Sequence, residues 1–195
     1  MPKNPTNLKA KLNKPPNNTK YYLIAIDGRG GAGKTTFSKY LMSLLPDFSF
    51  ICGDVYFEPV DHPITSGGFN EERFQEDVIT PLNNSETTIN FRPYIWDSNP
   101  HIKDIPVTIT KGVFIDRVYS FSFDLNYDLK IWVDTPRDVT ITRGIGRSSM
   151  PEIEAEKVWQ KLWKPLEDSY ISKSNPIKLA DIVIDGTKPF DQQIV

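Results

Sequence analysis

The sequence predicts an α/β fold in which a five-stranded parallel sheet lies between layers of helices. Short apolar runs recur along the chain, and the segments between them have helical periodicity. A length of 195 residues, with 38% hydrophobic and 25% charged residues, fits one globular domain with a substantial core. We therefore expect a three-layer sandwich in a single domain over residues 21–195.

Predicted strands and helices alternate in chain order. The runs that predict strands are 21–26, 48–52, 107–115, 128–133 and 181–184. The patterns that predict helices are 34–45, 71–83, 136–146 and 152–173. Asn70 is a suitable N-cap for the second helix, and Pro165 is expected to kink the last one.

A glycine-rich loop joins the first predicted strand to the first predicted helix. It reads Gly28-Arg29-Gly30-Gly31-Ala32-Gly33-Lys34-Thr35 and matches G-x-x-x-x-G-K-[ST], the phosphate-binding loop or P-loop. In such a loop, backbone N–H groups surround phosphate oxygens at the positive end of the following helix. Lys34 is expected to reach the β- and γ-phosphates, and the Thr35 hydroxyl to bind Mg²⁺. The residues predicted to bind a nucleoside triphosphate are Gly28, Gly30, Gly31, Ala32, Gly33, Lys34, Thr35 and Thr36.

The first 20 residues differ in composition from the rest. They hold five lysines, four prolines and five asparagines but no acidic residue, which predicts a flexible, solvated basic leader over residues 1–20. The lysines lack interleaved aromatic residues, so no nucleic-acid partner is expected. No apolar run approaches the roughly 20 residues of a membrane span, and no signal-peptide core is present. Together with the single cysteine, Cys52, this predicts a cytoplasmic protein without membrane attachment, and a homo-oligomer stays open.

Residues 53–106 form a predicted insertion. The segment is rich in Pro, Asn, Ser, Gly and aromatic residues, with one short strand candidate at 87–91. An insertion of this kind is expected to cover the second substrate, a small-molecule acceptor.

Asp54 is the leading candidate for a catalytic base. It follows the second predicted strand, at the carboxyl edge where ligands collect in open α/β sheets. A carboxylate there is suited to accept the proton of an acceptor hydroxyl or to hold Mg²⁺ through a water molecule. The alternative is a turn aspartate that caps a helix.

Two arginines are predicted to form a lid over about residues 143–151. Arg143 and Arg147 stand four residues apart at the end of a helical pattern, which places both on one helix face. A mobile lid that carries them would close over the phosphates and neutralise charge during phosphoryl transfer. The alternative is a solvated basic helix end.

The order of these motifs resembles the uridine kinase-like branch of the P-loop small-molecule kinases, relatives of phosphoribulokinase and pantothenate kinase. The further matching segments are Gly53-Asp54-Val55-Tyr56-Phe57, Asp61-His62-Pro63, Phe91-Arg92-Pro93-Tyr94, Gly112-Val113-Phe114-Ile115-Asp116-Arg117, Arg143-Gly144-Ile145-Gly146-Arg147 and Ala180-Asp181-Ile182-Val183-Ile184. The resemblance covers roughly residues 21–187. It implies transfer of a phosphoryl group from ATP, with Mg²⁺, to a hydroxyl of a small molecule. It also implies that Asp54 is the base and that Arg143 and Arg147 are lid residues.

Six residues are candidates for the acceptor pocket. They are Tyr56, Asp61, His62, Arg73, Tyr94 and Arg117. Asp61 is suited to a ribose diol, and Tyr94 or His62 to stacking on a base. A surface histidine and a structural ion pair are the alternatives for His62 and Arg117.

The chain departs from the family pattern at Lys111, where the family places an acid that helps to hold Mg²⁺. Thr35 and Asp54 are the residues predicted to bind Mg²⁺; Asp116 and Asp134 also follow predicted strands, so the carboxylate that completes the metal site stays open. Three functions follow: a nucleoside kinase, a kinase of a non-nucleoside such as a vitamin precursor or sugar, and a nucleotide-binding protein without turnover. A GTPase is disfavoured because no Asn-Lys-x-Asp motif follows the loop.

Overall fold

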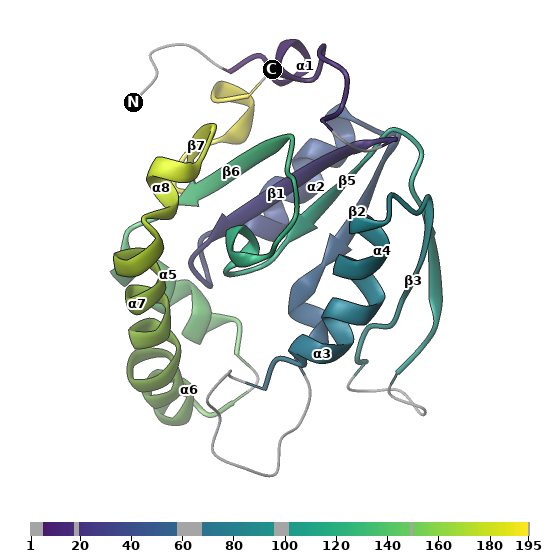
Figure 1. The fold of residues 1–195 in the computed structure, drawn as a ribbon. Helices are drawn as coiled ribbons and strands as arrows, with labels where there is room; N and C mark the ends of the chain where they lie inside the picture. The colour runs from purple at the N-terminus through teal and green to yellow at the C-terminus, as the bar shows by residue number, and fades with distance from the viewer. Residues whose placement is uncertain (1–5, 18–19, 58–67, 96–101, 149, 195) are drawn as a thin grey trace.

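The computed structural model describes residues 6–17, 20–57, 68–95, 102–148 and 150–194. Its centre is a five-stranded sheet in the order β2-β5-β1-β6-β7, with all neighbouring strands parallel (Figure 1). The strands are β1 (Tyr22–Gly28), β2 (Phe48–Cys52), β5 (Gly112–Asp116), β6 (Leu129–Asp134) and β7 (Ile182–Asp185). The predicted α/β fold with a five-stranded parallel sheet flanked by helices is confirmed.

Alternate residues of the central strand face two separate cores. Leu23 and Ala25 of β1 belong to one apolar cluster, whereas Ile24 and Ile26 belong to the other. All four side chains are at most 1% exposed. A strand buried on both faces reads as a continuous apolar run, which is why the sequence pattern identified it.

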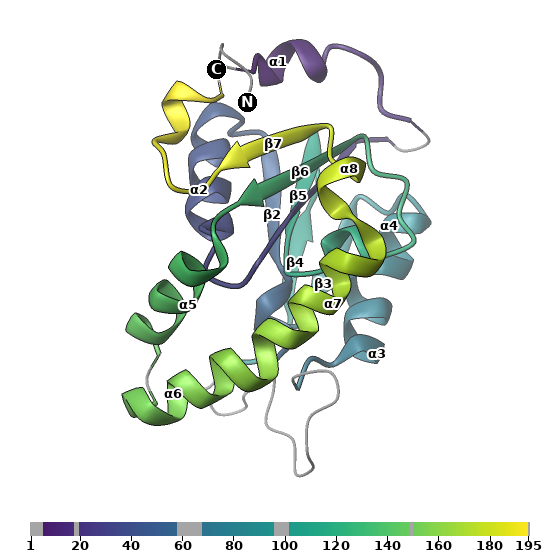
Figure 2. The same ribbon diagram turned by 90° about the vertical axis from the view of Figure 1, so that its left-hand side faces the viewer.

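Helices cover both faces of the sheet (Figure 2). The helical segments are α1 (Leu8–Lys11), α2 (Lys34–Leu44), η1 (Gly53–Tyr56), α3 (Glu71–Phe74), η2 (Gln75–Ile79), α4 (Thr80–Asn83), η3 (Ser120–Ser122), α5 (Arg137–Gly146), α6 (Glu152–Val158), η4 (Trp159–Trp163), α7 (Lys164–Ser174), α8 (Pro176–Leu179) and η5 (Phe190–Gln192). Helix α2 packs on one face, and the continuous α3-η2-α4 helix packs on the other together with α7. The Asn70 side chain accepts a hydrogen bond from the Arg73 N–H (2.9 Å), as predicted for an N-cap.

The long helix near the C-terminus continues past Pro165. Its irregularity is the π-helical segment η4, which directly precedes α7, and Pro165 lies in the first turn of α7. Proline lacks an N–H, so the backbone of the preceding turn must rearrange around the missing hydrogen bond.

The predicted strand 107–115 is two strands in two sheets. Its first part belongs to β4 (Ile105–Thr108), which pairs antiparallel with β3 (Thr88–Phe91) within the insertion. Its second part is β5 of the central sheet. Between them the chain is held by the Asp47 carbonyl, which accepts from the Lys111 N–H (3.3 Å) and the Thr110 hydroxyl (2.7 Å). An apolar run alone does not show where one strand ends and the next begins.

Part of the predicted solvated leader, residues 6–17, packs on the domain through one buried side chain, while most of its other residues are exposed. Leu8 in α1 is only 1% exposed and joins the apolar cluster beside α2. The Tyr22 hydroxyl, which has one proton to donate, lies within hydrogen-bond reach of the Leu12 and Lys14 carbonyl oxygens of the leader. Composition averages over a segment, so it misses one leucine that finds an apolar site on the domain.

Candidate active site

The predicted P-loop connects β1 to α2 at the carboxyl edge of the sheet. Two of its glycines are required by the backbone. Gly31 (φ +83°) would place a Cβ only 2.3 Å from the Thr140 carbonyl oxygen, and Gly33 (φ +100°) adopts a left-handed conformation directly before α2. The N–H groups of the first helical turn have no partners within the helix, so they are available to an anion.

Lys34 lies inside this loop. It is 5% exposed, and its Nζ donates to the carbonyl oxygens of Gly28 (3.1 Å) and Arg29 (3.2 Å). The loop therefore brings an ammonium group and the amino end of α2 to one place, as the motif predicted. The other predicted nucleotide-binding residues lie in the loop or in the first turn of α2, because all of them fall between Gly28 and Thr36.

Two carboxylates lie beside the loop at the ends of neighbouring strands. Asp54 follows β2 in the 3-10 turn η1, and Asp116 is the last residue of β5, paired in register with Cys52. Asp116 contacts the Ser38 hydroxyl (3.3 Å) and the side chain of Thr35. Oδ1 of each aspartate is buried, and no hydrogen-bond partner for it is found in the part of the chain that the structure describes.

Burial and the nearby charged groups shift the pKa of Asp116. Burial raises the pKa of Asp116 to about 6; nearby Lys34 opposes the rise and Asp54 adds to it. A divalent cation would reverse the effect of burial, because it favours the ionised carboxylate. Unsatisfied carboxylate oxygens and a threonine hydroxyl are oxygen ligands of the kind that Mg²⁺ prefers. Within the described ranges no three His, Cys, Asp or Glu side chains gather around one point, so water or phosphate oxygens would complete the shell of an ion here.

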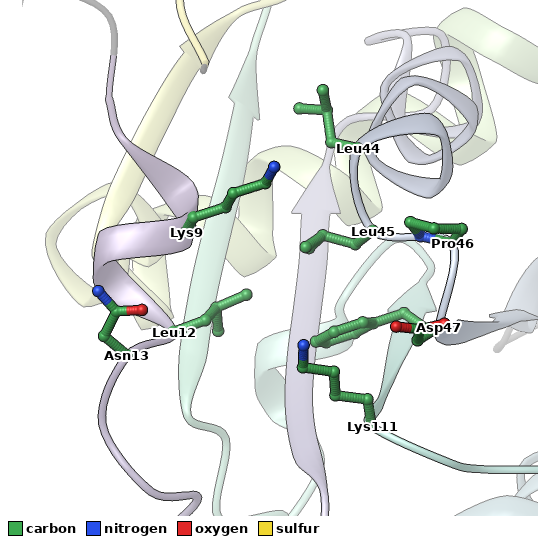
Figure 3. A pocket seen from close by; sticks show the side chains of 9 residues that line it. Lys9, Leu12, Asn13, Leu44, Leu45, Pro46, Asp47 and Lys111 are labelled. Carbon is green, nitrogen blue, oxygen red and sulfur yellow. The ribbon is translucent and has the colours of Figure 1, made fainter.

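Lys111 lies at the opposite edge of the sheet. It directly precedes Gly112, which pairs with Tyr22 at the amino ends of β5 and β1, whereas the P-loop follows the carboxyl end of β1. Figure 3 shows Lys111 in a pocket with Lys9 of the leader, below α2. The assignment of Lys111 to the metal-ligand position is therefore wrong, and a lost metal site cannot be inferred from it.

Asp134, the third acid considered, is exposed at the end of β6 and accepts from the Trp132 indole N–H (3.3 Å). Of the two strand-ending acids that the sequence left open beside Asp54, only Asp116 contacts the P-loop helix.

The two predicted lid arginines have different surroundings. Nη1 of Arg143 donates to the Gly186 carbonyl oxygen (3.0 Å) and lies 3.9 Å from the Cβ position of Gly33 in the loop. The Arg147 guanidinium lies 5.7 Å from the centroid of the Trp159 ring. Arg143 is thus already beside the loop, whereas Arg147 rests on the helix that follows. Movement of this segment stays a prediction.

The acceptor candidates are distributed between the core and the insertion. Tyr56 is fully buried, and its hydroxyl donates to Asp77 (3.0 Å). The Arg73 guanidinium lies 4.7 Å from the Tyr56 ring centroid, and Tyr94 donates its N–H to the Val55 carbonyl oxygen (2.7 Å). The structure therefore brings Tyr56, Arg73 and Tyr94 into one region. Asp61 and His62 lie outside the described residues.

Arg117 follows Asp116 and packs among aromatic rings. Its guanidinium lies 3.2 Å from the centroid of Phe69 and 4.9 Å from that of Phe123. Burial lowers the pKa of Arg117 to about 10, and the negative charge of Asp54 opposes that shift. No salt bridge to Arg117 is found within the described ranges, so the predicted alternative of a structural ion pair is not what holds this side chain there.

Sequence reasoning missed three buried charged residues around the loop. Asp27 at the end of β1 accepts hydrogen bonds from the N–H groups of Gly28 (2.6 Å) and Phe121 (3.1 Å) and from the Tyr170 hydroxyl (2.7 Å). The other two, Lys164 and Glu167, reach the loop from α7. The lysine and glutamate stand three apart in a predicted helix, which alone indicates only a helical ion pair.

Comparisons with known proteins agree with this architecture. The uridine kinase of Borreliella burgdorferi (strain ZS7) is 28% identical over 145 residues, which cover 64% of this chain and 66% of that protein. The uridine kinase of Borrelia hermsii (strain HS1 / DAH) is 27% identical over 183 residues, which cover 83% and 85%. The sequence matches no model of a protein family.

Among solved structures, a possible uridine kinase from Bacillus stearothermophilus superposes with a TM-score of 0.65 at 18% identity, covering 91% of this chain and 94% of that one. The chain therefore has the P-loop kinase fold and is a distant homologue of uridine kinases. In the described part of the chain, no helix has the length and apolar character needed to cross a membrane.

Proposed function

We propose that this protein transfers the γ-phosphoryl group of ATP to a hydroxyl group of a small molecule, and that the acceptor is a nucleoside of the uridine or cytidine type. The observation that carries the proposal is a pair of carboxylates beside the P-loop lysine, the half-buried Asp54 and the buried Asp116, each with a buried Oδ1 that has no hydrogen-bond partner in the described residues. The distant homology to uridine kinases supports the nucleoside as acceptor.

In this proposal the P-loop binds the triphosphate. The N–H groups at the start of α2 and the Lys34 ammonium group neutralise the phosphate oxygens. Mg²⁺ accompanies ATP as part of the substrate and supplies positive charge between the β- and γ-phosphates. Thr35 and Asp116 are the residues that would hold it, because their side chains contact each other and are oxygen ligands.

Asp54 acts on the acceptor. The acceptor oxygen attacks the γ-phosphorus, its proton passes to the Asp54 carboxylate, and the bond between the γ-phosphorus and the bridging oxygen breaks to release ADP. Arg143, beside the loop, offsets charge on the transferred group, and Arg147 joins it when the lid closes. The candidates for acceptor contacts are Tyr56, Asp61, His62, Arg73, Tyr94 and Arg117.

The test is ADP release from ATP and Mg²⁺ with and without a panel of acceptors. Stimulation by uridine or cytidine supports the proposal. Stimulation only by sugars or vitamin precursors would replace the nucleoside by another acceptor. Tight ATP binding without turnover on any acceptor would leave a nucleotide-binding protein.

A further inference from the structure

Helix α7 holds both polar groups of one loop residue, Gly30. The Gly30 N–H donates to Oε1 of Glu167 (2.9 Å), and the Gly30 carbonyl oxygen accepts from Nζ of Lys164 (2.9 Å). Lys164 also donates to Oε2 of Glu167 (2.7 Å), so three hydrogen bonds surround the glycine. The two peptide planes that flank Gly30 are therefore both fixed.

The pair is buried and its charges are balanced. Lys164 is 0% exposed and Glu167 is 3% exposed. Arg29 lies 3.5 Å from Oε2 of Glu167, so the carboxylate faces two cations and adds little net negative charge near a bound phosphate. Apolar side chains of similar volume often stabilise a fold as well as a buried ion pair does, so stability alone does not require this pair.

The segment η4, which directly precedes α7, links the loop to Arg147 through Trp159. A Cβ placed on Gly30 would lie 3.1 Å from the Trp159 ring, and one placed on Gly144 of α5 would lie 2.5 Å from it. Nζ of Lys164 is 5.0 Å from the ring centroid, on which Arg147 also rests. The loop, α5 and the long helix thus meet at one indole.

We propose that Lys164 and Glu167 are positioning residues that set the P-loop in its triphosphate-binding geometry before the nucleotide arrives. This inference rests on the proposed function in so far as the loop binds ATP. A glycine-rich segment loses much conformational freedom when it becomes ordered. Fixing both peptide groups of Gly30 in advance lowers that entropic cost of binding. The pair therefore acts on nucleotide affinity and leaves recognition of the acceptor unchanged.

Calorimetric titration with a non-hydrolysable ATP analogue and Mg²⁺ tests this without relying on turnover. Lys164→Met and Glu167→Ala are expected to raise the Kd of the analogue at least about fivefold. Glu167→Gln, which keeps an oxygen acceptor for the Gly30 N–H, should fall between these variants and the wild type. Glu156→Gln is the matched control, because Glu156 is exposed on α6 and its side chain accepts a hydrogen bond from Gln160 (2.9 Å), away from the loop residue Gly30.

The double variant Lys164→Met/Glu167→Met separates positioning from stability. Two apolar side chains should restore the melting temperature lost in the single variants, while the raised Kd should persist. A folded double variant that binds the analogue with wild-type affinity would overturn the inference. Absence of binding by the wild type would instead overturn the proposed function, and the inference with it.

Discussion

Asp116 ends β5 and Asp54 lies in the turn that follows the neighbouring parallel strand β2, and Oδ1 of each is buried with no hydrogen-bond partner in the described residues. The two carboxylates repel each other, and burial raises the cost of ionising Asp116. Lys34 offsets part of this cost, and a bound cation would offset more. The proposed function assigns the cation and the acceptor hydroxyl group to this site.

Asp54→Asn should lower kcat by at least about 100-fold, because an amide cannot accept the acceptor proton. The measurement is ADP release with the best acceptor from the panel. Asp47→Asn is the control, since Asp47 is an exposed acid at the other edge of the sheet. A loss below about threefold in Asp54→Asn would remove its role as base.

The stability of the metal-free protein should depend on pH through Asp116. Its pKa is raised from 3.8 to about 6, so the folded state binds this proton more tightly than the unfolded state. The resulting stabilisation is complete below about pH 4 and is lost as the pH rises through about 6. The change is of the order of 3 kcal/mol.

Urea unfolding from pH 4 to 7 in EDTA checks this. Relative to Asp116→Asn, the wild type should lose free energy of unfolding across that range. Parallel curves for the two proteins would show that Asp116 titrates normally.

Lys111→Glu should leave Mg²⁺-dependent activity within about twofold of the wild type. Lys111 lies at the amino ends of the strands, and screening weakens interactions across that distance. Activity measured against Mg²⁺ concentration is the readout. A rise of several-fold, or a shifted Mg²⁺ dependence, would place Lys111 near the metal after all.

Leu8→Ala should destabilise the fold by about 2 kcal/mol, because the leader buries this side chain in the core beside α2. Urea unfolding gives the free energy, and Lys9→Ala, an exposed position in the same helix, is the control. Equal stability of both variants would mean that residues 6–17 contribute little to the folded state.

The P-loop could be predicted from the sequence because its chemistry depends on residues that are neighbours in the sequence. Its glycines, Lys34 and Thr35 follow one another between a strand and a helix, and the structure retains that order. The main helices and the central strands could also be predicted, since the spacing of their apolar residues is a local property of the sequence. The split of residues 107–115 was not visible, because both halves are apolar and only their partners differ.

The choice of the second acid needed the sheet register. Lys111 directly precedes β5, and Asp116 is the last residue of β5. The two are only five residues apart in the sequence, yet the strand places them at opposite edges of the sheet. Likewise, Glu167 reaches Gly30 across 137 positions of the chain.

The sequence by itself therefore determined the nucleotide loop and the class of fold, because short-range geometry encodes both. Only the tertiary structure decided which carboxylates meet, where the leader packs and which helix supports the loop. Those contacts form between segments that are distant in the sequence. The free energy gained by burying apolar surface depends on all of these segments packing together.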